Sequence, residues 1–335
     1  TTLRNRRAVA AQQLQVARAE VLAATQKSFT DDASRAELAA LEGRVAERSA
    51  VSRVLLFYVN DPAVVIGRHQ NPWAETDPAA LEAGDVRLAR RTSGGGAVWH
   101  DGGVLNYSFL LPRREYRRPE LMETVRRALA RLGFNARVEQ DTSLFVGARK
   151  ISGHAFRLRG DLALHHGTLL ISADLTRLRA ALTPVCRIRT SAAIASIRAP
   201  VMNLVELDPR CTAEMCIEAI AAEVSRLWGP IEQVWDERDL DEVAIRTLTE
   251  RHRSWSWQYG ETPPFTAEFS SATDAAAAEL WLADVREGRL VALQCESRPL
   301  LLPEPARALL GHPFDPPAIL AILRRGSPSP LQVTI

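Results

Sequence analysis

The sequence predicts an α/β protein with a mixed β-sheet, followed by a small α+β domain. Two amphipathic patterns with a 3.6-residue period predict helices over residues 119–132 and 212–228, each ending at a glycine. Short apolar or alternating runs bounded by Gly, Pro, Asn or Asp are typical of strands. Such runs occupy residues 54–59, 63–66, 96–99, 105–111, 144–146 and 164–171. Strands that alternate with helices in this way favour a sheet covered by helices.

A proline-rich break, SWSWQYGETPPF over residues 254–265, separates this pattern from a second one. Beyond it, residues 280–285 and 289–294 flank a Glu-Gly turn and predict a hairpin, and residues 306–310 and 317–324 predict short helices. We therefore predict three parts: a basic N-terminal segment over 1–28, a larger domain over 29–262 and a small domain over 263–335.

Composition excludes several classes of protein. With 42 Lys and Arg against 40 Asp and Glu, the chain lacks the strongly basic face of an electrostatic nucleic-acid binder, so no nucleic-acid partner is expected. No apolar run approaches the length of a membrane span, so none is predicted. The four cysteines form no CxxC pair, which fits a reducing compartment.

The first 28 residues are rich in Ala and Gln and carry five basic residues against the single acid Glu20. This composition is typical of an organellar transit peptide or its remnant, and equally of a solvated basic helix. The first interpretation predicts a mitochondrial location and the second a cytoplasmic one.

Lysine is almost absent from the chain. Lys27 and Lys150 are the two lysines, and every other residue among the 42 basic ones is arginine. Because lysine offers a compact, rotatable point charge that the planar guanidinium cannot imitate, Lys150 is a candidate for chemistry rather than for generic charge. The alternative is a lysine retained by chance.

Three motifs carry candidate site residues. RRTSGGGAVWHD (90–101) places three glycines behind two arginines; glycines let a backbone approach a ligand, successive N–H groups bind anions, and arginine adds a phosphate clamp. A flexible hairpin would give the same glycines. KISG (150–153) sets Lys150 beside a predicted Ser-Gly turn. In LHHGTLL (164–170), strand alternation places His165 and His166 on opposite faces, and a structural role competes with a functional one for each.

Together with VVIGRHQNPW (64–73), these motifs resemble the lipoate-protein ligase A and mitochondrial lipoyltransferase family of the biotin/lipoate protein ligase superfamily. The resemblance extends from about Phe29 into the C-terminal domain. It implies a biotin/lipoate protein ligase-like catalytic domain over 29–262 and an accessory domain over 263–335. The implied reaction transfers a lipoyl group from lipoyl-AMP to a lysine of 2-oxoacid dehydrogenase E2 subunits or the glycine-cleavage H protein. ATP or lipoyl-AMP, and lipoate, are the implied substrates, with Mg²⁺ expected beside a triphosphate.

The resemblance also implies roles for individual residues. Lys150 would contact both the acyl carbonyl and the phosphate as the catalytic residue, and Arg91 would contact the nucleotide. The implied nucleotide and lipoyl-AMP site consists of Arg91, Ser93, Gly94, Gly95, Gly96, Ala97, Val98, Trp99, His100, Asp101, Ser152, Gly153, His166, Gly167 and Thr168.

The sequence departs from the family pattern at three places. Val104 stands where the family usually has Asn, Asp141–Thr142 replaces Asn-Asp with one extra residue before Lys150, and residues 37–42 only echo the N-terminal element. A transferase that accepts preformed lipoyl-AMP demands less of a nucleotide site than a ligase that also activates lipoate with ATP, so both activities stay open.

Two other functions compete with this interpretation. Cys186 follows Gly167 by nineteen residues, and Arg187 and Arg189 beside it are expected to lower its pKa, as an octanoyl or lipoyl amidotransferase with a thioester nucleophile requires. A non-catalytic acyl-carrier-binding protein is the third possibility. The complete RRTSGGG motif and the accessory domain favour adenylate chemistry over the thioester, and the retained Lys150 favours catalysis over simple binding.

Overall fold

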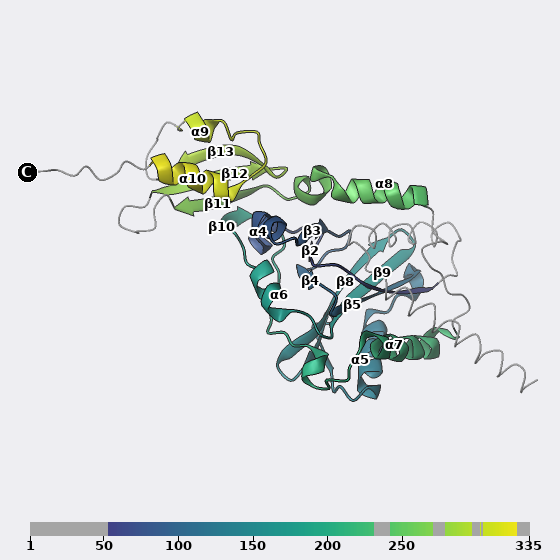
Figure 1. Cartoon of the computed structure of the whole chain (residues 1–335). Helices are drawn as coiled ribbons and strands as arrows, with labels where there is room; N and C mark the ends of the chain where they lie inside the picture. Colours follow the sequence, from purple (N-terminus) through teal and green to yellow (C-terminus); the bar gives the residue numbers. More distant parts are fainter. Residues whose placement is uncertain (1–52, 231–241, 271–278, 297–301, 303, 327–335) are drawn as a thin grey trace, which may run out of the picture.

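The computed structural model describes residues 53–230, 242–270, 279–296, 302 and 304–326 (Figure 1). The predicted basic segment over 1–28, Lys27 and the element over 37–42 lie outside these residues. Among the helices that are described, none is long and apolar enough to span a membrane.

A six-stranded antiparallel sheet forms the centre of the larger unit. Its spatial order is β1 (Val54–Val59), β5 (Val104–Pro112), β9 (Leu162–Leu170), β8 (Arg149–Arg159), β7 (Ser143–Val146) and β6 (Arg137–Glu139). The nine residues of β5 are all buried, as expected for a strand that is covered on both faces.

Two helices, α5 (Arg118–Arg131) and α7 (Ala213–Trp228), lie side by side over one face of this sheet (Figure 1). In α5, Leu121, Val125 and Leu129 recur at helical spacing and pack into the main core. The Thr212 hydroxyl caps α7 by accepting a hydrogen bond from the Met215 amide, and the helix ends at Gly229, whose φ is 94°.

A small mixed sheet holds the glycine-rich motif. β2 (Ala63–Ile66) pairs in parallel with β3 (Arg87–Arg90) and antiparallel with β4 (Val98–His100). The short helices α4 (Pro78–Ala83) and α6 (Leu175–Ala181) pack against it, and α3 (Pro72–Glu75) follows β2 in the chain. Short 3₁₀ turns, η1 (Arg113–Glu115) and η2 (Leu204–Glu206), complete the larger unit. The parallel pairing occurs in this sheet, so the predicted mixed α/β fold is confirmed although the central sheet is antiparallel.

The C-terminal unit is a four-stranded antiparallel sheet with two helices. β11 (Phe265–Ser270), β12 (Leu280–Arg286) and β13 (Arg289–Cys295) pair in sequence order, and α9 (Glu304–Arg307) and α10 (Pro316–Gly326) pack on them. Helix α8 (Glu242–Arg253) and a π-helical turn, η4 (Ser256–Gly260), lead into β11.

The fourth strand of that sheet comes from the larger unit. β10 (Arg187–Ser191) pairs with β11, so the C-terminal sheet includes residues far from 263–335. The predicted boundary at 262–263 lies just before β11, and a division by sequence position alone does not describe this sheet.

The predicted helices over 119–132 and 212–228 and the C-terminal hairpin are confirmed, with ends shifted by a few residues. The Ser-Gly turn predicted at KISG is wrong, because these residues belong to the eleven-residue strand β8. Pairing with β7 and β9 holds Ser152 and Gly153 extended.

Candidate functional site

A β-bulge aims Lys150 at the site. β7 and β8 pair Leu144 with Ser152 and the following Phe145 with Lys150, which leaves Ile151 as an extra residue in β8. In a regular strand, alternation would place Lys150 on the face of Ser152. The bulge turns it instead toward Gly153, where a Cβ would lie 3.1 Å from the Lys150 Nζ. Because Gly153 lacks a side chain, it leaves room for the ammonium group.

Two hydrogen bonds to the segment over 200–202 hold the backbone of Lys150. Its N–H donates to the Pro200 carbonyl at 2.8 Å, and its carbonyl accepts from the Met202 amide at 3.1 Å. The half-buried side chain forms no ion pair with any described acidic residue, and burial lowers its pKa. A desolvated cation without a carboxylate partner is suited to an anionic ligand.

Two cavities meet at Lys150. The larger, of about 420 Å³, lies over the sheet between the glycine-rich motif and the loop from β6 to β7. The smaller, of about 270 Å³, has mostly apolar walls that include Trp99, Leu170 and Leu178. Lys150, Gly153 and Thr168 line both cavities. The structure thus places three predicted site residues from β8 and β9 at one junction.

The glycine-rich motif forms the opposite wall of this junction. Ala97 and Val98 line both cavities, Gly95 and Gly96 line the larger one, and Trp99 lines the smaller one. Gly95 has a φ of 89°, which favours glycine. At Gly67, a Cβ would lie 2.1 Å from the Gly95 carbonyl oxygen, so these two loops pack backbone to backbone.

Arg91 was expected to clamp a phosphate, and in this structure its guanidinium shapes the loop. Nη2 donates to the carbonyls of Gly94 and Gly96 at 2.6 and 2.8 Å, and Nη1 donates to Val65 at 3.0 Å. Arg91 also lines the larger cavity. Its hydrogen-bonding capacity is directed mainly at backbone carbonyls.

The other predicted residues divide into two groups. His100, His166 and Gly167 line the larger cavity, and Ser152 lines the smaller one. Ser93, Gly94 and Asp101 line neither of the two. The Asp101 carboxylate instead accepts hydrogen bonds from the Trp99 Nε1 and from two backbone amides, which orders the chain after β4. The buried Ser93 hydroxyl is hydrogen-bonded to the His166 Nε2 at 2.6 Å.

His165 and His166 lie on opposite faces of β9, as predicted. His165 is fully buried beneath the sheet, where it is hydrogen-bonded to His154 at 2.9 Å. Burial lowers the pKa of His165 to about 3 and that of His154 well below its usual value, so both are neutral at pH 7. His154 also lines the larger cavity and is hydrogen-bonded to the Tyr107 hydroxyl. The sequence analysis missed this hydrogen-bonded group of His154, His165 and Tyr107, because the sequence pattern gave no reason to single out His154.

Residues 194–199 form a covering segment that sequence reasoning also missed. Ile197 lines both cavities yet has 81% of its surface exposed. Ser196 anchors the segment: its hydroxyl accepts from the Ala97 amide at 2.7 Å, and its amide donates to Glu75 at 3.0 Å. The available signal was an isoleucine-containing run of small residues, SAAIASIRAP, that fits neither helical nor strand periodicity.

The Cys186 thiol does not have the properties of a nucleophile. It lines neither of these cavities and packs against the apolar core of the C-terminal unit. Burial and Asp77 raise its pKa to about 12, so the expected lowering by Arg187 and Arg189 is wrong. Both arginines are turned to acidic partners, Glu268 and Glu296. The structure gives no support to a thioester mechanism.

No group of three or more His, Cys, Asp or Glu side chains suited to a metal ion occurs among the described residues. Val104, which replaces the usual Asn, is fully buried in the core beside the small sheet and lines neither cavity. Thr142, which replaces the usual Asp, lines the larger cavity.

Residues 35–225 match the lipoyl protein ligase A/B catalytic domain. This match covers more than half of the chain and includes Lys150, the glycine-rich motif and LHHGTLL. The chain therefore belongs to the lipoyl protein ligase A/B catalytic domain family.

Solved structures support the same fold. A putative lipoate protein ligase from T. acidophilum with bound lipoic acid is 25% identical, with a TM-score of 0.57 over 69% of this chain and 95% of that chain. LipL1 from P. falciparum in complex with lipoate is 21% identical, with a TM-score of 0.60 over 80% and 82%. A lipoate-protein ligase A bound with ATP is 24% identical, with a TM-score of 0.58 over 69% and 95%.

Proposed function

We propose that this enzyme transfers a lipoyl group from lipoyl-AMP to a lysine of a carrier domain. The observation that carries the proposal is the position of Lys150 at the junction of two cavities, a desolvated cation with no acidic partner in the described parts of the chain. An acyl-adenylate matches this arrangement, because its negatively charged acyl-phosphate linkage lies between two larger groups, the acyl chain and the nucleoside. A structure of this fold holds lipoic acid and another holds ATP, which supports the choice of ligand.

We assign the acyl chain to the larger cavity and the nucleotide base to the smaller one. The smaller cavity offers the Trp99 indole and the aliphatic side chains of Leu170 and Val201, which suit a flat base. The larger cavity extends past Gly95 and His166 to Phe145, and so accommodates a longer chain. Lys150 would then lie at the linkage between the two.

Lys150 serves both half-reactions in this arrangement. In activation, a lipoate carboxylate oxygen attacks the α-phosphorus of ATP and pyrophosphate leaves. In transfer, the neutral amine of the acceptor lysine attacks the acyl carbonyl, AMP leaves, and the nitrogen gives its extra proton to solvent. Negative charge gathers on oxygens near the ammonium group in both steps, and removal of one such donor typically costs about 100-fold in rate. Mg²⁺ would neutralise the triphosphate during activation.

The acceptors we propose are E2 lipoyl domains and the glycine-cleavage H protein. A structural match of 24% identity from Thermoplasma acidophilum is described as a bi-partite lipoate protein ligase with its E2 lipoyl domain. Mitochondrial location stays a prediction from the composition of residues 1–28.

Acceptor mass measures the proposed reaction. Purified protein is incubated with an unlipoylated E2 lipoyl domain and either lipoyl-AMP or lipoate with ATP and Mg²⁺, and intact mass of the acceptor is recorded. Mass gain with lipoyl-AMP alone indicates a transferase, and gain with both donors indicates a complete ligase. No gain with either donor, on E2 domain or H protein, would refute the proposed function.

A further inference from the structure

Arg90 is a buried cation that binds no carboxylate of the residues that the structure describes. Its side chain has no exposed surface and donates seven hydrogen bonds. The acceptors are five backbone carbonyls and the Thr262 hydroxyl. The nearby Glu261 carboxylate pairs instead with Arg68 at 2.8 Å. Burial and the charge of Arg68 lower the pKa of Arg90 to about 10, which leaves it charged at neutral pH.

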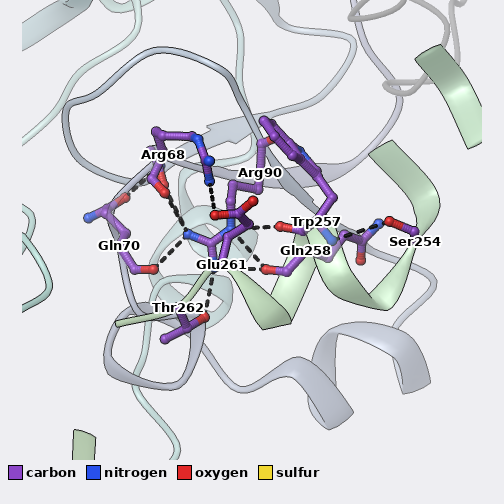
Figure 2. Close-up of polar contacts among 9 residues, drawn as sticks. Arg68, Gln70, Arg90, Ser254, Trp257, Gln258, Glu261 and Thr262 are labelled. Carbon is purple, nitrogen blue, oxygen red and sulfur yellow. Dashed lines mark hydrogen bonds and ion pairs between the residues drawn. The ribbon is translucent and has the colours of Figure 1, made fainter. Parts of the chain in front are cut away.

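The acceptors come from two segments far apart in the sequence (Figure 2). Nη1 binds the carbonyls of Gly67, Arg68 and Gln70 in the loop after β2. Nε and Nη2 bind the carbonyls of Trp257 and Gln258, in the π-helical turn before β11. The Trp257 Nε1 donates back to the Arg90 carbonyl at 2.7 Å. Arg90 therefore joins the loop over 67–70 to the segment that leads into the C-terminal unit.

The loop over 67–70 in turn holds the wall of the larger cavity. The Arg68 amide donates to the Ser93 carbonyl at 2.8 Å, and Gly67 packs directly on the Gly95 carbonyl. The Gln70 side-chain amide donates to the Ile194 carbonyl and to the Ser196 hydroxyl. Gly95, Ile194 and Ser196 all line the larger cavity. The loop over 67–70 thus connects Arg90 to two parts of the cavity wall, the glycine-rich motif at Gly95 and the covering segment at Ile194 and Ser196.

We propose that Arg90 is a positioning residue through which the segment over 257–262 sets the shape of the larger cavity. A buried charge held by carbonyl dipoles is costly to desolvate, and such a group fixes one arrangement of the groups that it binds. Lysine at this position provides three donors without the planar fork, so it cannot reach both segments in the same way. This inference rests on the proposed function only for the assignment of lipoyl-AMP as the cavity's ligand.

Hydrogen exchange and kinetics of the Arg90→Lys protein test the proposal. The amides of Arg68, Ala97 and Ile194 donate hydrogen bonds in the cavity wall, so we expect them to exchange faster. A smaller fraction of molecules then holds the competent wall, so the KM for lipoyl-AMP should rise by about tenfold while kcat changes far less. Arg127→Lys is the control, because Arg127 is 63% exposed and pairs with Glu123 on α5.

A second, milder variant keeps the proposal testable if the Arg90→Lys protein fails to fold. Thr262→Val removes one acceptor of Arg90, and Thr262 lines neither cavity. It should accelerate exchange at the same three amides by a smaller factor. Faster exchange confined to 254–262, with unchanged KM, would overturn the proposal. If the wild-type protein transfers no lipoyl group, the proposed function fails, and exchange at the three amides alone then decides for or against Arg90.

Discussion

At the scale of the residue, the position of one ammonium group organises the site. Lys150 reaches the junction of the cavities because Ile151 is an extra residue in β8 and because Gly153 has no side chain. Its backbone is fixed by hydrogen bonds to Pro200 and Met202. The backbone that carries the cation is thus set before any ligand binds, which reduces the reorganisation needed to stabilise charge.

Burial of the Lys150 ammonium group should lower the free energy of unfolding. Burial lowers its pKa below the usual value of 10.5 for a lysine, so the unfolded chain binds this proton more tightly than the folded one. The cost is fully present below the folded pKa and disappears as pH rises past the unfolded pKa. We therefore expect Lys150→Met to have a larger free energy of unfolding than wild type at pH 7, with the difference shrinking toward pH 10.

Denaturant unfolding at the two pH values measures this difference. Arg127→Met, on the exposed surface of α5, serves as the control for loss of a positive charge. A Lys150→Met protein that is less stable than wild type at pH 7 would indicate that the side chain mainly supports the fold.

At the scale of the element, the glycine-rich loop depends on one glycine more than on its neighbour. A Cβ on Gly95 would lie 2.9 Å from the Arg91 Nη2, at a φ of 89°, whereas a Cβ on Gly94 would meet nothing within 4 Å. Gly95→Ala should cost about 1–2 kcal/mol of backbone strain and weaken lipoyl-AMP binding. Gly94→Ala should change neither appreciably.

Calorimetric titration with lipoyl-AMP and thermal unfolding of the two variants check this prediction together. Equal effects of the two substitutions would show that the loop has no fixed conformation in the functional protein. Stability loss in Gly95→Ala with unchanged affinity would indicate a structural hairpin instead of a ligand loop.

Sequence periodicity predicted the elements that bury an apolar face. The pattern at Leu121, Val125 and Leu129 gave α5, and the Glu-Gly turn gave the hairpin of β12 and β13. It failed at β8, because Ser152 and Gly153 are typical of turns and only pairing with β7 and β9 keeps them extended. The motifs contain Lys150 and other residues that line the two cavities, but the bulge that aims Lys150 depends on register between strands, which periodicity does not encode.

At the scale of the whole molecule, the two units are joined by more than a linker. β10 extends the C-terminal sheet, and Trp73 of α3 packs against Phe265 and Phe314 of the C-terminal core. Arg90 adds the buried polar connection (Figure 2). None of these contacts between the two units was predictable from the sequence, because each joins residues more than 70 positions apart. The C-terminal unit is therefore packed on the larger unit that holds the site.

The most direct test of the central claim is acceptor lipoylation by Lys150→Arg. If Lys150 stabilises charge on the phosphate and carbonyl oxygens, the larger, planar guanidinium will not take its place beside Gly153, and transfer from lipoyl-AMP should fall by about 100-fold or more. Acceptor mass gain over time, measured beside the wild-type protein at equal concentration, gives the rate. Arginine already serves wherever this chain needs only a positive charge beyond residue 27, so wild-type turnover by Lys150→Arg would contradict the catalytic assignment.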